Sequence, residues 1–185
     1  MAIDTKELLK KSLEESIKES SEGFSAEEKA KCEVLMKKMI DEEITPQDAM
    51  GLDKTFLEQI YATALTFFQA GKYQKAEGMY RILMTLNPLD ERFPMATAAC
   101  LHKLNKYEEA IQYYGLTSAI TPNDPLPFFY SSDCFIKCDA IVEAAVMLKL
   151  VLQRVNNQPQ YAILKERAER SLESSENEIN GGGDL

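Results

Sequence analysis

The sequence predicts an all-α fold in which helical hairpins repeat about every 34 residues. The closing prolines Pro88 and Pro122 stand one such period apart. Small and aromatic residues recur at the same interval, as Ala64 and Ala98, Tyr73 and Tyr107, Ala76 and Ala110, Tyr80 and Tyr114. A weaker third copy contains Ser132, Phe135, Ala144 and Leu148. This pattern is typical of tetratricopeptide repeats, so we expect three repeats in a right-handed superhelix with helical flanks at both ends.

Such an architecture indicates a binding function. One repeat cannot bury its apolar face alone, so repeats stack and form a concave groove that can hold another polypeptide. We expect four segments: an N-terminal helical flank over 1–53 with a candidate role in dimerisation, a three-repeat domain over 54–156, a capping helix over 157–178 and a disordered tail over 179–185.

The first expected helix covers about residues 5–20. Its apolar stripe is narrow and consists of Leu8, Leu9, Leu13 and Ile17. Serine and glycine residues over 20–23 then interrupt the helical pattern. A stripe this thin on a terminal helix indicates either loose docking or a dimer interface.

The second expected helix begins at a capping box formed by Ser25 and Glu28 and ends near Glu43. A short helical turn should follow, with Thr45 as its cap and Pro46 at its first position. The repeat helices are expected at about 54–70, 73–87, 91–104, 107–121, 126–137 and 140–156, with a final amphipathic helix at about 159–175. That last helix would cover the exposed edge of the third repeat.

Charge and hydropathy exclude several classes of protein. The net charge is −9, and residues 1–53 hold 8 Lys against 14 Asp and Glu, whereas the span 54–156 is neutral. An acidic chain without a basic stripe is a poor ligand for a phosphate backbone, so we expect no nucleic acid partner. No apolar run is long enough to span a bilayer, and the N-terminus does not resemble a signal peptide. We therefore expect a cytoplasmic protein without membrane insertion.

The four cysteines are expected to be structural. Cys100 and Cys134 stand one repeat length apart and occupy the same position of successive repeats, where a small side chain is preferred. Cys134 and Cys138 would share a helix face, and His102 is the only histidine. However, Cys-x-x-Cys pairs are absent, so reduced cysteines acting as compact apolar residues are favoured over a metal site. We expect neither a metal nor a cofactor.

Groove-facing positions lie three and four residues apart on the first helix of each repeat. In this register they are Tyr61, Leu65 and Phe68, then Arg92, Met95, Ala99 and His102, and finally Leu126, Phe129, Asp133 and Ile136. This set is mostly apolar and aromatic, which suits an extended peptide that presents a few aliphatic or proline side chains. Clamping of a C-terminal carboxylate is disfavoured, because Tyr61 and Leu65 stand where Lys and Asn would be needed.

Some aromatic residues have a structural alternative. The residues at core positions of the repeat are Tyr73, Tyr80, Tyr107 and Tyr114, and packing is favoured for them. Tyr61 and Phe68 are favoured as groove residues. A lone histidine such as His102 is more often a polar lining residue than a catalytic one.

Several motifs resemble the class II chaperones of bacterial type III secretion systems. They are Leu57-Glu58-Gln59-Ile60-Tyr61, Gln69-Ala70-Gly71-Lys72-Tyr73, Asp90-Glu91-Arg92-Phe93, Ala98-Ala99-Cys100, Tyr107-Glu108-Glu109-Ala110-Ile111, Pro125-x-Pro127-Phe128, Asp133-Cys134 and Glu143-Ala144. The similarity covers about residues 44–155. The Asp-x-Arg-Phe and Pro-x-Pro-Phe elements distinguish this family from general tetratricopeptide proteins. Phe68 replaces the tyrosine more usual at its position, and both flanks match poorly.

This resemblance implies a function and a site. Such chaperones hold hydrophobic translocator proteins before export and take a short P-x-L-x-x-P-like segment along the concave face. The implied contacts are Tyr61, Leu65, Phe68 and Tyr73, with Tyr80 and Met95 nearby. A homodimer through the N-terminal helices and binding to a gatekeeper protein of the secretion apparatus are further implications of the resemblance.

Two other classes of function are weighed against a chaperone. The sequence lacks the G-x-S-x-G, P-loop, G-x-G-x-x-G and H-E-x-x-H motifs, so an enzyme is not expected. A general tetratricopeptide adaptor that joins folded proteins through its convex face is the alternative. The adaptor would retain its partners when groove aromatics are truncated, whereas a cargo chaperone would lose them.

Overall fold

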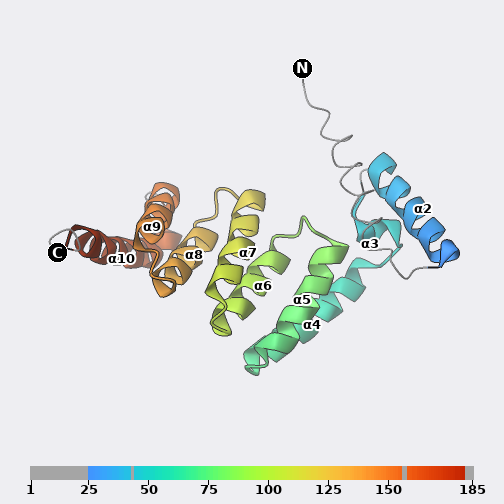
Figure 1. Ribbon diagram of the computed structural model, residues 1–185, viewed down its shortest axis with the longest axis horizontal. Helices are drawn as coiled ribbons and strands as arrows, with labels where there is room; N and C mark the ends of the chain where they lie inside the picture. Colours follow the sequence, from blue (N-terminus) through green and yellow to red (C-terminus); the bar gives the residue numbers. More distant parts are fainter. Residues whose placement is uncertain (1–24, 43, 156–157, 182–185) are drawn as a thin grey trace, which may run out of the picture. The chain divides into compact units, whose positions relative to one another are not determined.

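The structure is a computed structural model that describes residues 25–42, 44–155 and 158–181. The described residues form α-helices and one 3-10 turn, with no strand among them (Figure 1). This confirms the predicted all-α fold. The chain forms two compact units. One contains the described residues up to Glu58 together with Thr85–Asn87, and the other contains Gln59–Met84 and the described residues from Pro88 onward. The division falls inside the first repeat helix, between Glu58 and Gln59.

The first unit begins with capped helices. Its elements are α2 (Ala26–Glu42), α3 (Pro46–Ala49) and the first turn of α4 (Lys54–Gln69). The expected capping box is present, because the Ser25 amide donates to the Glu28 carboxylate at 2.7 Å and the Glu28 amide donates to Ser25 Oγ at 3.3 Å. Thr45 Oγ1 likewise accepts from the Asp48 amide at 3.2 Å. The predicted dimerisation stripe, Leu8, Leu9, Leu13 and Ile17, lies outside the described residues.

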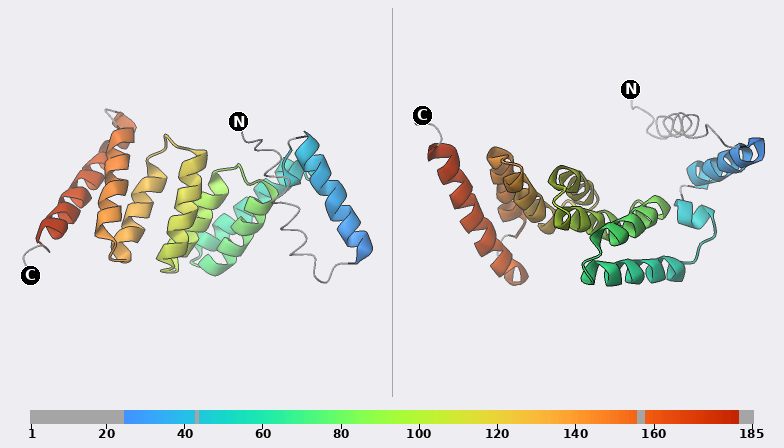
Figure 2. Two further views of the ribbon diagram at one scale, coloured as in Figure 1. Left: turned by 45° about the horizontal axis from the view of Figure 1, so that its top comes forward. Right: turned by 60° about the horizontal axis from the view of Figure 1, so that its bottom comes forward.

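The second unit is a stack of helical hairpins. Its elements are most of α4, most of α5 (Tyr73–Leu86), α6 (Arg92–Lys103), α7 (Tyr107–Ile120), α8 (Leu126–Lys137), α9 (Ile141–Val155), the 3-10 turn η1 (Pro159–Tyr161) and α10 (Ala162–Gly181). The first six helices lie within one or two residues of the predicted bounds. The hairpins α6/α7 and α8/α9 and then α10 pack against one another in chain order (Figure 2). This arrangement is that of three tetratricopeptide repeats followed by a further helix.

Each repeat turns between its two helices through a residue with positive φ. Gly71, Asn105 and Asp139 have φ values of 72°, 58° and 61°, and each follows the previous one by one repeat length. The next residue donates a backbone hydrogen bond five positions back, from Lys72 to Phe67, from Lys106 to Leu101 and from Ala140 to Phe135, each at 2.9 Å. This is the Schellman arrangement, which satisfies helix-terminal carbonyls and requires the left-handed conformation at one residue.

Small residues at repeated positions allow the helices to approach closely. Ala64, Ala98, Ala76, Ala110 and Ala144 are all fully buried. Cys100 and Cys134 are also fully buried, and this burial raises the pKa of each thiol to about 12. A thiol of that kind stays protonated at neutral pH and acts as a small apolar side chain, as expected from its position in the repeat.

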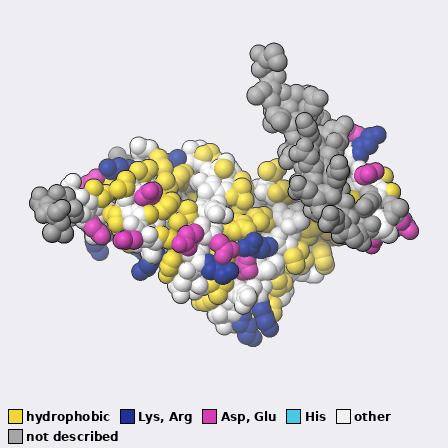
Figure 3. Space-filling model, viewed as in Figure 1, with side chains coloured by type: hydrophobic (Ala, Val, Ile, Leu, Met, Phe, Trp, Pro, Cys, Tyr) yellow, Lys and Arg dark blue, Asp and Glu magenta, His cyan; other side chains and the backbone are white. Residues whose placement is uncertain are grey.

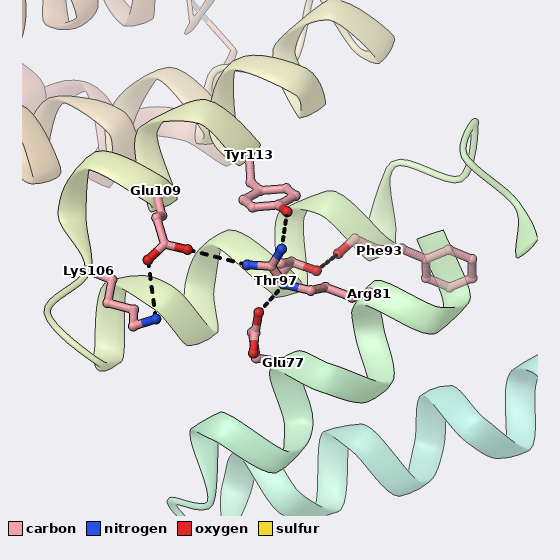
Figure 4. A network of polar contacts seen from close by, with 7 residues as sticks. All are labelled: Glu77, Arg81, Phe93, Thr97, Lys106, Glu109 and Tyr113. Atoms are coloured by element: carbon pink, nitrogen blue, oxygen red, sulfur yellow. Dashed lines mark hydrogen bonds and ion pairs between the residues drawn. The ribbon is translucent and has the colours of Figure 1, made fainter. Parts of the chain in front are cut away.

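A polar network joins the first and second repeats on α5 and α7 (Figure 4). Arg81 forms an ion pair with Glu77 on its own helix, donates to the Tyr113 hydroxyl at 2.7 Å and lies 3.4 Å from Glu109. Its guanidinium also lies 5.1 Å from the centre of the Tyr113 ring. Lys106 completes the network through a 3.2 Å ion pair with Glu109. The planar guanidinium of Arg81 has several donors, and these contacts fix the register of the two neighbouring hairpins.

The C-terminal helix is longer than the sequence predicts. Residues 159–161 form a 3-10 turn, and α10 runs to Gly181, which extends into the segment expected to be a tail. Ala168 is fully buried with Val151 and Val155 of α9 in one apolar cluster. Farther along the helix, Lys149 forms a 2.9 Å ion pair with Glu176. The contacts of α10 with α9 therefore continue past residue 175, where the sequence predicts that the helix ends.

The surface of the repeats carries mixed charge. Figure 3 shows lysine, arginine and carboxylate side chains lying close together among apolar side chains on one face. Within the described ranges, no helix combines the length and apolar character that a membrane span requires.

Candidate functional site: a pocket on the inner repeat helices

A pocket of about 520 Å³ lies within the second unit. Its lining residues come from the first helices of the repeats, with additions from α7 and α10. They are Phe68, Met95, Ala99, His102, Lys103, Tyr114, Phe129, Tyr130, Ser132, Asp133, Ile136, Arg167 and Ser171. A cavity of this size with a largely apolar wall and a few polar groups is typical of a ligand site.

Half of the ten predicted groove residues line this pocket. They are Phe68, Met95, Ala99, His102 and Phe129, joined by Asp133 and Ile136 from the same repeat positions. The structure thus brings together side chains that the repeat register places on equivalent faces of α4, α6 and α8. The remaining five are Tyr61, Leu65, Tyr73, Tyr80 and Arg92, and they lie elsewhere on the first two repeats.

An aromatic group on α4, α5 and α6 contains Tyr61. Its ring centre lies 5.5 Å from that of Tyr80 and 6.0 Å from that of Phe93, and the Arg92 guanidinium lies 5.1 Å from the same ring. Arg92 is itself oriented by Asp90, whose carboxylate accepts a hydrogen bond from Arg92 Nη2 at 2.6 Å. The side-chain hydrogen bond from Arg92 lowers the pKa of Asp90, so the carboxylate stays charged. Tyr61 is therefore half-buried against other rings and is partly covered by a cation.

Tyr73 and Tyr80 differ in their accessibility. Tyr80 exposes only 1% of its surface and packs against Tyr61, so it supports the groove from beneath rather than lining it. Burial also raises the pKa of its hydroxyl. Tyr73 is half-buried and meets Phe68 edge-on with ring centres 5.2 Å apart. Leu65 exposes 39% of its surface on the same helix as Phe68. The burial of Tyr80 agrees with the packing role that its repeat position favours.

His102 lies in a polar cluster on the pocket wall. Its Nε2 atom lies 2.9 Å from Asp133 Oδ2, and its Nδ1 atom lies 3.4 Å from the buried Tyr114 hydroxyl. The Tyr107 ring meets the imidazole edge-on at 5.8 Å. Burial raises the pKa of Tyr114, so this hydroxyl is neutral at physiological pH. The imidazole is thus held by partners on α7 and α8, which suits a fixed lining residue.

Sequence reasoning missed the contribution of α10. Arg167 and Ser171 line the pocket, and the Arg167 guanidinium lies 4.9 Å from the centre of the Phe129 ring. Arg167 stands one repeat length after Asp133, so one further extension of the repeat register would have placed it on the groove. Lys103 and Tyr130 were also missed. Tyr130 stacks on Tyr114 with ring centres 5.8 Å apart. Packing contacts of this kind, rather than the repeat period, determine the position of Tyr130.

The chemistry of the pocket favours binding. Its walls combine aromatic faces, a methionine and a few hydrogen-bonding groups, which can hold an extended chain by shape and apolar contact. No group of three or more His, Cys, Asp or Glu side chains suited to a metal ion occurs in the described part of the chain.

Comparisons with known proteins agree with this architecture. The family described as anaphase-promoting complex, cyclosome, subunit 3, matches residues 36–117. Low calcium response locus protein H of Yersinia pseudotuberculosis is 28% identical over 118 residues, which cover 64% of this chain and 70% of the relative.

Two solved structures are similar in fold and in sequence. The Yersinia enterocolitica type III secretion chaperone SycD, in complex with a peptide of the translocator YopD, has a TM-score of 0.66 and 27% identity, and the match covers 69% of this chain and 97% of SycD. The structure of PcrH of Pseudomonas aeruginosa with the chaperone-binding region of PopD has a TM-score of 0.67 and 28% identity, and the match covers 70% of this chain and 97% of PcrH.

The fold and the pocket define a tetratricopeptide-repeat binding protein. The solved structures that it is similar to include the type III secretion chaperone SycD, and the resemblance predicted from the sequence is confirmed. The chain is homologous to these chaperones.

Proposed function

We propose that this protein is a cytoplasmic chaperone that binds an extended segment of type III secretion translocator proteins and keeps them competent for secretion. The pocket on α4, α6, α8 and α10 carries this proposal. Related chaperones of similar fold were solved with a peptide of YopD and with the chaperone-binding regions of PopD and PopB, so the class of cargo follows from homology.

The pocket explains why a hydrophobic cargo would be retained. Phe68 on α4 and the largely buried Phe129 on α8 line the pocket, and Met95 on α6 adds an adaptable apolar contact. An extended segment can place one or two apolar side chains there while its backbone stays accessible to polar groups on the rim. Burying those side chains removes from water the surface through which translocators would associate before export.

The first experiment compares two phenylalanines on the same helix. Phe68 lines the pocket, whereas the adjacent Phe67 lies outside it, where Lys72 and Lys75 each lie 5.9 Å from its ring centre. Loss of a deeply seated aromatic contact costs about 2–4 kcal/mol, or roughly 30- to 1,000-fold in affinity. We therefore expect Phe68→Ala to abolish co-purification of a co-expressed translocator while Phe67→Ala retains it.

Circular dichroism of both variants checks that helicity is unchanged. Tyr61→Ala is expected to weaken cargo binding as well. Full cargo recovery with folded Phe68→Ala would contradict the proposal. It would favour the adaptor alternative, in which partners bind a surface outside the pocket. In the complex with the unaltered protein, protease protection of the bound cargo identifies the segment that the groove holds.

Homodimerisation through Leu8, Leu9, Leu13 and Ile17 stays a prediction, as does binding to a gatekeeper protein of the secretion apparatus. Light scattering of the free chaperone and of its cargo complex measures whether the protein forms a homodimer. Co-purification with gatekeeper candidates measures binding to the gatekeeper protein.

A further inference from the structure

Helix α10 continues the groove rather than merely covering its end. Leu65, Ala99, Asp133 and Arg167 follow one another at intervals of one repeat length, so they occupy the same position of successive first helices. The structure places Ala99, Asp133 and Arg167 around one pocket. Helix α10 therefore stands where the first helix of a fourth repeat would stand.

The exposed face of α10 is suited to contact with a peptide. Arg167 lies one helical turn after Ile163, which exposes 75% of its surface. Contact with the Phe129 ring, at 4.9 Å, holds the guanidinium beside the apolar part of the pocket. An aliphatic surface thus lies next to a positioned cation on the same face of the helix.

The charge of the pocket differs from that of the chain. Lys103 and Arg167 both line it, and among the described residues no carboxylate lies within 4.0 Å of either cation. The carboxylate of Asp133 lies 2.9 Å from His102. Two cations that have no ion-pair partner within the described ranges therefore face one pocket of a chain whose net charge is −9.

We propose that this pocket is a subsite for an acidic residue of the cargo that lies next to an apolar anchor. The anchor contacts Phe129 and Met95, and the acidic side chain pairs with Arg167, with Lys103 adding to the local positive potential. A guanidinium can donate two parallel hydrogen bonds to a carboxylate, which gives this contact directional selectivity. The inference rests on the proposed function, since it specifies which cargo segments the groove prefers.

The test uses the full chain and three fluorescein-labelled peptides. All share the core Pro-Ala-Leu-Ala-Ala-Pro, and they differ only in three flanking Glu, Gln or Lys residues on each side. Fluorescence anisotropy gives the three affinities at low and high salt. Bulk charge alone would favour the Lys peptide, because the chain is acidic. We expect instead that the Glu peptide binds about three- to tenfold more tightly than the Gln peptide, and that this preference shrinks with added salt.

Matched variants assign the preference to the subsite. Arg167→Met should lower binding of the Glu peptide to the level of the Gln peptide and leave the Gln peptide unchanged. Arg170→Met is the control, because Arg170 lies on the same helix outside the pocket and pairs with Glu166 at 2.7 Å. Lys103→Met should reduce the same preference. Lys137→Met should not, since Lys137 occupies the equivalent position of the next repeat outside the pocket.

The outcomes separate the two proposals. Equal binding of the Glu and Gln peptides, with both weakened by Phe68→Ala, would overturn the acidic subsite and leave the chaperone function standing. A preference for Glu that survives Arg167→Met would overturn the subsite too. No binding of any peptide would contradict groove binding itself, and the subsite with it.

Discussion

At the scale of single residues, Asp90 orients Arg92 next to the aromatic group around Tyr61. Its carboxylate accepts from the Arg92 side chain at 2.6 Å and from the Arg92 amide at 3.1 Å. Asp124, one repeat later, makes only the second kind of contact, since its side chain accepts from the Leu126 amide at 2.9 Å. The two aspartates therefore form a natural comparison between a carboxylate that pairs with an arginine and one that contacts only a backbone amide.

We predict that Asp90→Asn lowers the free energy of unfolding by about 0.5–1 kcal/mol at pH 7, whereas Asp124→Asn has a smaller effect. The Arg92 contact depresses the pKa of Asp90 below its usual 3.8. A depressed carboxyl pKa stabilises the folded state above the unfolded-state pKa, and this stability is lost as the pH falls through the folded-state pKa. The destabilisation by Asp90→Asn should therefore shrink as the pH falls through the depressed folded-state pKa of Asp90.

Urea unfolding at several pH values measures this difference. A destabilisation by Asp90→Asn that stays constant as the pH is lowered until the protein is fully protonated would show that packing, not charge, is responsible.

Sequence periodicity predicted the position of side chains better than their accessibility. Phe68, Met95 and Phe129 were expected on the groove and line the pocket. The register favoured packing equally for Tyr73 and Tyr80, but Tyr80 is fully buried and Tyr73 is only half-buried, because accessibility depends on neighbours that lie far apart in the sequence.

At the scale of elements, the turns between paired helices share one backbone geometry but differ in residue type. Gly71 adopts its φ of 72° without strain, whereas Asp139 adopts 61° despite its side chain. An added Cβ at Gly71 would meet no atom within 4 Å, so a substitution there changes conformational strain without a steric clash.

We predict opposite effects from two substitutions in these turns. Gly71→Ala should destabilise the protein by about 1 kcal/mol, since alanine disfavours positive φ. Asp139→Gly should stabilise it by about 0.5 kcal/mol, because glycine relieves the same strain. Shifts in the urea midpoint measure both effects. Destabilisation by both substitutions would indicate that side-chain contacts dominate at these turns.

Asn105 is less suitable for this comparison. Its side chain accepts a hydrogen bond from the Tyr107 hydroxyl at 2.7 Å, so Asn105→Gly would remove a contact as well as strain.

The length of α10 shows where sequence patterns lose information. Its apolar stripe was expected to end near Ser175, but the structure continues the helix to Gly181. Two contacts accompany this extension. Lys149 forms an ion pair with Glu176, and Ile179 lines a small pocket together with Val142 and Val146. Contacts of this kind join residues of two different helices and leave no local periodic signal.

At the scale of the whole molecule, a stack of repeats depends on its last element. Leu148, Val151 and Val155 of α9 are fully buried in one cluster with Phe129 and with Ala168 of α10. Each repeat contacts only its neighbours, so the final exposed face needs a cover.

We predict that Ala168→Arg destabilises the protein by about 3 kcal/mol or more, because a charged side chain cannot be accommodated at a fully buried position. Glu173→Arg is the matched control, since Glu173 is exposed on the same helix. Thermal unfolding measures stability, and size-exclusion chromatography detects association through uncovered apolar surface. Equal melting temperatures for the two variants would contradict the covering role of α10.

The sequence was most informative at this largest scale. The recurrence of Ala64 at Ala98 and of Ala76 at Ala110 was sufficient to predict paired helices, their order and their inner faces. The participation of α10 in the pocket was not predicted, because its apolar pattern alone suggested only a covering role. The spacing of Asp133 and Arg167 contained that information, but it becomes meaningful only when a fourth repeat is considered.

The position of α10 has a consequence for protein engineering. A helix that already occupies the first half of a module offers a natural splice point for lengthening the scaffold. A consensus second helix grafted after Asn180, followed by further modules, would elongate the recognition surface and give chimaeras that accommodate longer clients.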